Sequence, residues 1–198
     1  MSDSRVLILH GIGHHRPRAH WLWWLAEELR QRRIPVQYPQ LPAPDEPTPD
    51  AWIAIARAEL EMLGGGQTVI AHSLGTILWS HIAPSIPDDL RPARVALVAP
   101  PARQILEHDA GDFASLPLGP LDAGRTLIVG RETDPVRLES LEVLAERWGA
   151  PHVVVPGDGH LTPADGHGPY PGALEWVLGG GAASWVRVAG TASAGGAI

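Results

Sequence analysis

The chain has 198 residues, 44% of them hydrophobic and 19% charged, a composition typical of one globular domain with its own core. Its formal net charge of −7 argues against a nucleic-acid partner. The absence of cysteine excludes disulfides, thiolate metal sites and cysteine nucleophiles.

Hydrophobic periodicity predicts strands and helices that alternate along the chain. Short apolar runs predict strands over residues 5–9, 34–38, 68–72, 94–98, 126–129 and 152–155. Amphipathic or helix-compatible stretches predict helices over residues 20–32, 51–63, 74–82, 137–148 and 172–178. Asp50, after the proline-rich loop 39–49, suits a helix N-cap.

Strands that are apolar throughout and separated by helices indicate a parallel sheet covered on both faces. We therefore expect an α/β fold of three layers, with a mostly parallel sheet of about six strands, over residues 1–178. The Gly- and Ala-rich residues 179–198 are expected to be a flexible tail. The alternation around Trp185 leaves a second interpretation open, an edge strand or a contact with another subunit.

The most informative segment is 68–77, in which an apolar run leads into Ser73 and a helix-compatible run leads out of it. This pattern is typical of a nucleophile elbow, where a serine sits on a sharp strand-to-helix turn. Ala71 and Gly75 supply the small residues that such a turn needs, although glycine is more usual at the first position. The alternative is a helix start with Ser73 as a simple N-cap.

Polar residues follow the other strands where the carboxyl ends of a parallel sheet would gather them. Ser73, Asp134 and His160 occur in the chain order that α/β-hydrolases use for nucleophile, acid and base. These three residues are the predicted catalytic triad. Three other acidic residues remain alternatives for the acid: Glu132, Asp109 and Asp112. Asp158, close to His160 in the sequence, is interpreted as a turn residue.

Four motifs together resemble a known family. They are His10-Gly11-Ile12-Gly13 with His20-Trp21, then Ala71-His72-Ser73-Leu74-Gly75, then Thr133-Asp134-Pro135-Val136, and last Gly159-His160-Leu161 with Gly166 to Pro171. Over residues 5–178 the chain is similar to the small serine hydrolases related to YdeN and to the retinoblastoma-binding protein called nine. The resemblance implies a compact α/β-hydrolase without a large cap domain, acting on an ester-like or amide-like bond.

The expected oxyanion hole consists of the backbone N–H groups of Leu74, directly after the nucleophile, and of Ile12 in the first glycine-rich loop. Trp21 and Trp79 are the predicted substrate-binding residues, although aromatic residues at helical spacing are usually core. Residues 113–118 are further candidates for the pocket wall, and residues 100–120 can form only a small flap.

The predicted activity is that of a cofactor-independent serine hydrolase, carboxylesterase-like, acting on a small-molecule acyl substrate through an acyl-enzyme. A binding protein on a hydrolase scaffold, with a protein partner, and an amidase or peptidase with the same triad are the alternatives. The histidines at positions 10, 14, 15 and 20 raise the hypothesis of a metal-binding site. No carboxylate lies among them in the sequence, so we expect no metal and no cofactor. The first residues do not resemble a signal peptide and no apolar run is long enough for a membrane span, so we expect a cytoplasmic protein.

Overall fold

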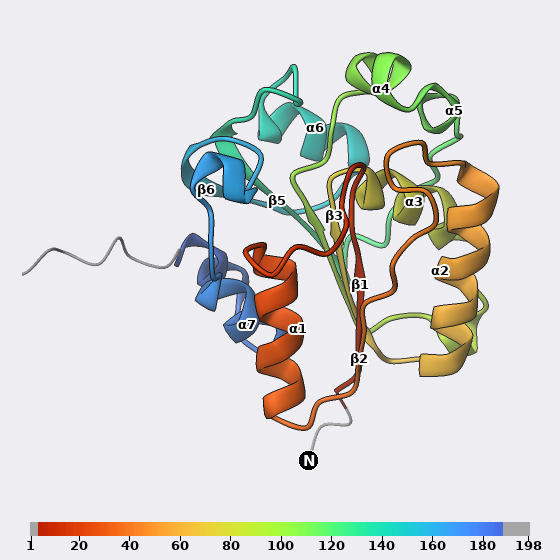
Figure 1. Ribbon diagram of the computed structural model, residues 1–198, viewed down its shortest axis with the longest axis vertical. Coiled ribbons are helices and arrows are strands. Elements are labelled where there is room, and N and C mark those ends of the chain that lie inside the picture. Colours follow the sequence, from red (N-terminus) through yellow and green to blue (C-terminus); the bar gives the residue numbers. More distant parts are fainter. Residues whose placement is uncertain (1–3, 188–198) are drawn as a thin grey trace, which may run out of the picture.

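The computed structural model describes residues 4–187 and arranges them around one six-stranded sheet (Figure 1). The strands are β1 (Val6–Leu9), β2 (Val36–Gln37), β3 (Thr68–His72), β4 (Arg94–Val98), β5 (Thr126–Thr133) and β6 (His152–Asp158). Their order across the sheet is β2-β1-β3-β4-β5-β6, and every neighbouring pair is parallel. All strands therefore end at the same edge, which is where α/β sheets carry their sites.

Seven α-helices connect or follow these strands in the described part of the chain. They are α1 (Trp21–Gln31), α2 (Pro49–Leu63), α3 (Leu74–Ile82), α4 (Arg103–Asp109), α5 (Gly111–Ala114), α6 (Leu141–Trp148) and α7 (Pro171–Val177). Short 3-10 turns add η1 (Ala83–Ser85), η2 (Asp88–Leu90), η3 (Pro163–Asp165) and η4 (Ala182–Val186). No helix among residues 4–187 is long and apolar enough to cross a membrane.

The sheet is apolar on both faces because helices cover both of them (Figure 1). Successive side chains of a strand point to opposite faces, so β1 sends Val6 and Ile8 to one layer and Leu7 and Leu9 to the other. The first layer contains α1 and α7, and the second contains α2, α3 and α6. This is the three-layer arrangement that the continuous apolar runs predict.

Two helix starts differ from the sequence prediction by two residues or more. Helix α2 begins at Pro49, with Thr48 as its N-cap, because proline suits the first helical position; Asp50 therefore lies inside the first turn. Helix α6 begins at Leu141, where the Ser140 side chain accepts a hydrogen bond from the Val143 N–H, and not at residue 137. Residues 134–140 are thus free to form the loop that carries the predicted acid.

The segment after α7 packs against the domain as far as the structure describes it. Trp185 in η4 is fully buried, and its carbonyl accepts a hydrogen bond of 2.6 Å from the Tyr170 hydroxyl. Its ring meets those of Trp21 and Trp176 at centroid distances of 6.3 and 5.6 Å. Residues 179–187 are therefore part of the packed domain, and the rest of the expected tail, 188–198, lies outside the described residues.

Candidate active site

Ser73 occupies a sharp turn between β3 and α3. Its backbone has φ 54° and ψ −127°, a conformation that a non-glycine residue adopts only under strain. The turn is tied to the neighbouring strand β4, because the Ser73 N–H donates to the carbonyl of Val98 at 2.9 Å. A Cβ on Gly75 would lie 2.7 Å from the carbonyl oxygen of Leu9, so only glycine allows α3 to approach β1 this closely. The sequence Ala71-His72-Ser73-Leu74-Gly75 thus forms the sharp strand-to-helix turn that a nucleophile elbow requires.

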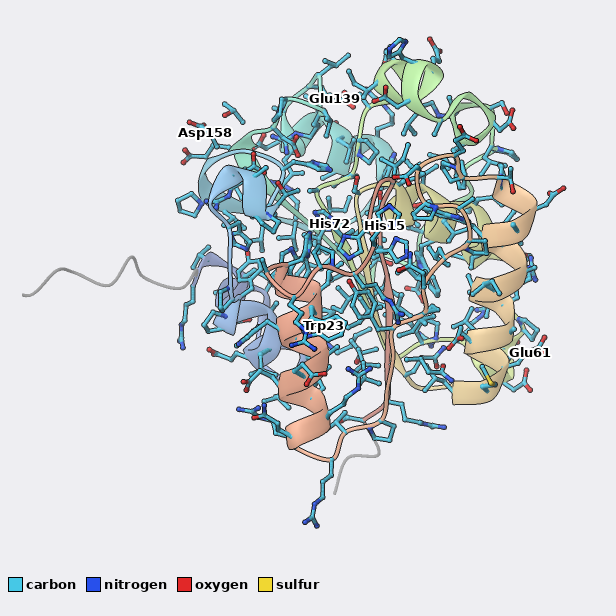
Figure 2. The ribbon with its side chains drawn as sticks, viewed as in Figure 1. His15, Trp23, Glu61, His72, Glu139 and Asp158 are labelled. Atoms are coloured by element: carbon cyan, nitrogen blue, oxygen red, sulfur yellow. The ribbon has the colours of Figure 1, made fainter. Side chains whose placement is uncertain are left out.

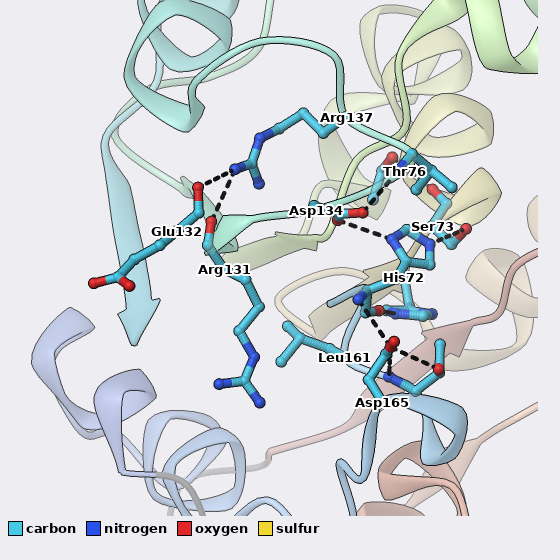
Figure 3. Close-up of polar contacts among 12 residues, drawn as sticks. His72, Ser73, Thr76, Arg131, Glu132, Asp134, Arg137, Leu161 and Asp165 are labelled. Carbon is cyan, nitrogen blue, oxygen red and sulfur yellow. Dashed lines mark hydrogen bonds and ion pairs between the residues drawn. The ribbon is translucent and has the colours of Figure 1, made fainter. Parts of the chain in front are cut away.

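Ser73, His160 and Asp134 form one row of hydrogen bonds, and Figure 3 labels Ser73 and Asp134 at its two ends. His160 Nε2 lies 2.8 Å from Ser73 Oγ, and His160 Nδ1 lies 2.9 Å from Asp134 Oδ2. The Asp134 side chain is fully buried, whereas 15% of the His160 side chain is exposed. The acid is therefore shielded from water while the histidine edge reaches the surface, the geometry that a serine nucleophile and its base require.

The loop after β5 fixes the orientation of the Asp134 side chain. Asp134 Oδ1 accepts a hydrogen bond from the Val136 N–H at 3.0 Å, which leaves Oδ2 for the histidine. The buried guanidinium of Arg137 donates to the carbonyls of Arg131 and Glu132 at 2.8 and 3.0 Å (Figure 3).

The other acidic residues considered from the sequence lie elsewhere. The Glu132 carboxylate faces the Gly157 N–H at 3.4 Å, and Asp158 accepts from the Thr133 hydroxyl, so neither contacts His160. Asp109, at the end of α4, lines the cavity in front of Ser73 without contacting the histidine. The structure therefore brings together the three residues of the predicted triad and none of the alternatives.

The loop that carries His160 is fixed by contacts from three sides. Asp165 accepts hydrogen bonds from the His160 N–H at 2.8 Å and from the Thr162 N–H at 3.1 Å. On the core side, His72 Nε2 donates to the His160 carbonyl at 3.0 Å, and Trp21 Nε1 donates to the Leu161 carbonyl at 3.0 Å. Leu161 has φ 56° and is fully buried. Figure 2 labels His72, which is buried, near the centre of the view.

The contact that His72 makes with the loop of His160 is not evident from the sequence. From the sequence, a histidine directly before the serine is interpreted as a structural residue whose side chain points away from Ser73. Here its ring contacts the ring of His160 at a centroid distance of 5.2 Å and holds the His160 backbone. Burial keeps the pKa of His72 well below its usual value, so the ring is neutral. Its only sequence signal is its position directly before the serine.

The first loop approaches the elbow closely at Gly11. A Cβ there would lie 2.6 Å from Ser73 Cβ and 3.3 Å from the Leu74 nitrogen, so the loop and the elbow fit only because position 11 is glycine. The hydrogen bonds of residues 4–187 leave the N–H groups of Ile12 and Leu74 without a protein acceptor. Both residues line the cavity in front of Ser73, together with Gly11 and Gly13. Two backbone donors beside a nucleophile can bind a developing oxyanion.

Residues 6–178 of the sequence match the serine hydrolase family. The chain belongs to this family. A YdeN-like hydrolase from Pectobacterium atrosepticum superposes with a TM-score of 0.69 at 21% sequence identity, covering 88% of each chain. The ydeN gene product of B. subtilis gives a TM-score of 0.70 at 19% identity, covering 88% of this chain and 97% of that one. Est1E from Butyrivibrio proteoclasticus gives 0.60 at 16% identity, covering 79% of both chains.

These structures share the fold, and the family match makes the protein an enzyme of the serine hydrolase class. The resemblance to YdeN-like hydrolases that the four motifs indicate is confirmed. No curated protein sequence matches the chain significantly.

The cavity of this serine hydrolase in front of Ser73 measures about 290 Å³. The predicted substrate-binding residues do not line it. Trp21 is fully buried behind the loop of His160, and Trp79 lines a separate cavity on the far side of α3. Both face inward because the apolar side of a helix packs on the sheet. The flap after β4 instead places Ile105 and Leu106 of α4 over the serine.

The histidine rings of the first loop pack side by side, and their nitrogen atoms are not arranged around one common position where a metal ion would bind. His10 Nδ1–H donates to the Gly11 carbonyl and its Nε2 accepts from the Leu41 N–H, both at 2.9 Å, so this neutral ring braces the loop that contains Ile12. Burial lowers the pKa of His10 to about 4. Among residues 4–187, no group of three or more histidine and carboxylate side chains is arranged to hold a metal ion.

Proposed function

We propose that this serine hydrolase is a carboxylesterase-like enzyme that needs no cofactor. It cleaves an ester or related acyl bond of a small molecule with Ser73 as nucleophile, His160 as base and Asp134 as the acid that orients the base. The observation that carries this proposal is the pair of hydrogen bonds of 2.8 and 2.9 Å that connects the three side chains beside a cavity.

In the first half of the reaction, Ser73 Oγ attacks the substrate carbonyl while its proton moves to His160 Nε2. The carboxylate of Asp134 accepts from Nδ1–H and stabilises the imidazolium that forms. The negative oxygen of the tetrahedral intermediate lies against the N–H groups of Ile12 and Leu74. When the carbon–oxygen bond to the alcohol breaks, His160 returns the proton to the departing oxygen, and the acyl group stays on Ser73.

In the second half, a water molecule takes the place of the alcohol. His160 removes its proton as the water oxygen attacks the acyl carbon, the bond to Ser73 Oγ breaks, and the serine recovers its hydrogen. The products are one carboxylic acid and one alcohol. An amidase would use the same steps with a nitrogen leaving group, so the relative rates on a para-nitrophenyl ester and the matching para-nitroanilide separate the two activities.

Intact-mass measurement after reaction with a fluorophosphonate tests the nucleophile independently of the natural substrate. We expect one adduct on the wild type, none on Ser73→Ala, and slow labelling of His160→Ala. Ser80→Ala is the matched control, because Ser80 lies on the same helix and its hydroxyl only donates to the Thr76 carbonyl at 2.8 Å.

A folded wild-type protein that forms no adduct would contradict the proposal and favour a binding protein on a hydrolase scaffold. Labelling of Ser80→Ala at the wild-type rate shows that loss of the adduct is specific to the elbow serine. Circular dichroism of each variant separates a chemical effect from a loss of fold.

A further inference from the structure

A row of histidine rings leads away from the triad into the protein. In order of contact the rings are those of His160, His72, His20, His14 and His10. Successive ring centroids lie 5.2, 5.3, 4.6 and 4.9 Å apart. The proposed mechanism uses only His160, yet His14, His20 and His72 also line the cavity in front of Ser73. One wall of the cavity is therefore made largely of imidazole.

The hydrogen bonds of two rings determine what this wall offers to a ligand. His20 Nδ1 accepts the Leu22 N–H at 3.2 Å and so caps α1, which places the proton of the neutral ring on Nε2. This Nε2–H, on the far side of the ring from the cap, is the one polar group that His20 can present to the cavity. His72 uses its Nε2–H on the His160 carbonyl and keeps only an acceptor nitrogen.

The histidine wall is polar but carries no charge near neutral pH. Burial, reinforced by neighbouring histidines, lowers the pKa of His20 to about 3 and that of His14 to about 2. The wall therefore offers a neutral N–H donor, which suits an uncharged oxygen, and supplies no cation to pair with a carboxylate or phosphate. The exposed carboxylate of Asp109 at the same cavity also disfavours an anionic ligand.

The facing wall is apolar, since it consists of Ile105 and Leu106 of α4, Val136 and Pro101. A cavity of about 290 Å³ with one apolar and one donor wall fits a short molecule with hydrocarbon on one side and oxygen on the other.

We propose that the enzyme takes an uncharged acyl substrate that carries a second oxygen beyond the scissile group, and that His20 Nε2–H donates a hydrogen bond to this oxygen. The inference rests on the proposed function, because it concerns the cavity of the same serine. The second oxygen belongs either to the acyl chain or to the alcohol, and the chemistry of recognition is the same for both.

Two pairs of esters that differ by one CH₂-to-oxygen exchange test the inference. The acyl pair is para-nitrophenyl pentanoate and para-nitrophenyl beta-methoxypropanoate, and the alcohol pair is butyl acetate and methoxyethyl acetate. For wild type we expect kcat/KM, corrected for the hydroxide-catalysed rate, to favour the ether member of one pair. The pair that shows the preference identifies the side of the substrate that contacts His20.

His20→Asn is the decisive variant, because asparagine caps a helix as well as histidine does here but has no distant N–H. We expect it to lower the ether-to-alkyl ratio by about 2- to 12-fold, the range of a neutral hydrogen bond. His15→Asn is the control, since His15 is exposed, pairs with Asp45 at 2.9 Å and does not line the cavity.

The inference is overturned if His20→Asn leaves the ether-to-alkyl ratio of kcat/KM unchanged in both pairs while the fluorophosphonate still labels Ser73 at the wild-type rate. That result would leave the serine hydrolase proposal intact. The wild type supplies a test that needs no variant: preference for the alkyl member of both pairs also contradicts the inference. Failure of the wild type to label would contradict the proposed function itself.

Discussion

Gly11→Ala is expected to slow the proposed reaction strongly, because the added methyl group would lie directly against Ser73. The added Cβ would lie 2.6 Å from Ser73 Cβ, 2.9 Å from Ser73 Oγ and 3.3 Å from the Leu74 nitrogen. Carbon atoms in contact prefer about 3.5–4.0 Å, so the loop and the elbow must separate by on the order of 1 Å. Both sides of this contact belong to the proposed reaction centre, because the loop presents Ile12 N–H and the elbow presents Ser73.

The magnitude follows from this displacement. A misplacement of about 1 Å costs on the order of 10²-fold in rate, and loss of one oxyanion donor costs about 10²- to 10³-fold. We therefore expect Gly11→Ala to lower kcat/KM on para-nitrophenyl butyrate by about 10²- to 10³-fold. Overpacking of this kind also lowers the free energy of unfolding by about 1–3 kcal/mol, which a urea titration measures separately.

Gly168→Ala is the matched control, because a Cβ at Gly168 has no heavy atom within 4 Å and the residue lies outside the proposed centre. Its activity is expected to stay within about twofold of wild type. A folded Gly11→Ala protein that keeps half of the wild-type kcat/KM would refute the argument that the close approach of loop and elbow sets the oxyanion geometry.

Three further predictions concern side chains around the site. Asp134→Asn is expected to lower kcat by about 10⁴-fold at unchanged fold, because its amide N–H₂ would face the triad histidine and force the proton onto the wrong ring nitrogen; activity within tenfold of wild type on an ester would contradict this. His72→Phe keeps an aromatic ring but leaves a buried carbonyl of the histidine loop without its donor, so the unfolding free energy measured in urea should fall by about 1–3 kcal/mol, and an unchanged value would show that the contact is not stabilising. Acid should weaken the fold: burial holds the pKa of His10, His14 and His20 at about 4, 2 and 3. The unfolded chain then binds more protons, and stability present above about pH 6.5 is lost toward about pH 4 at up to about 1.4 kcal/mol per pH unit for each ring. Urea titrations at about pH 8, 6 and 5 measure this loss, and a flat profile would contradict it.

The sequence by itself predicted the parts of the fold that depend on local pattern. Each of the six apolar runs forms a strand, because continuous hydrophobicity records burial on both faces of a sheet. The elbow was predicted from ten consecutive residues, since a strand, a turn and a helix that follow one another without a break leave little freedom in how Ser73 is presented. Asp134 and His160 were predicted from chain order, and the structure places them beside Ser73; their catalytic roles stay predictions.

Errors arose where a residue's surroundings come from distant segments. Trp21 and Trp79 are large aromatic residues of the kind that line substrate pockets. Both, however, belong to helix faces that pack on the sheet. Ile105 and Leu106 line the cavity because the flap folds over the serine, which no local pattern reveals. Trp185 lies in a Gly- and Ala-rich stretch typical of a tail, yet its ring fills a space between α1 and α7.

Sequence pattern determined the sheet, the order of its strands along the chain and the serine at the turn, because these follow from periodicity and from residues that are adjacent in the chain. Tertiary structure alone decided the long-range contacts that hold the site: His72 contacts the His160 loop across 88 residues, and Trp21 contacts Leu161 across 140. Contacts over such separations depend on how two layers of helices pack on one sheet. Packing is a property of all the layers together, and so it cannot be read from any one segment.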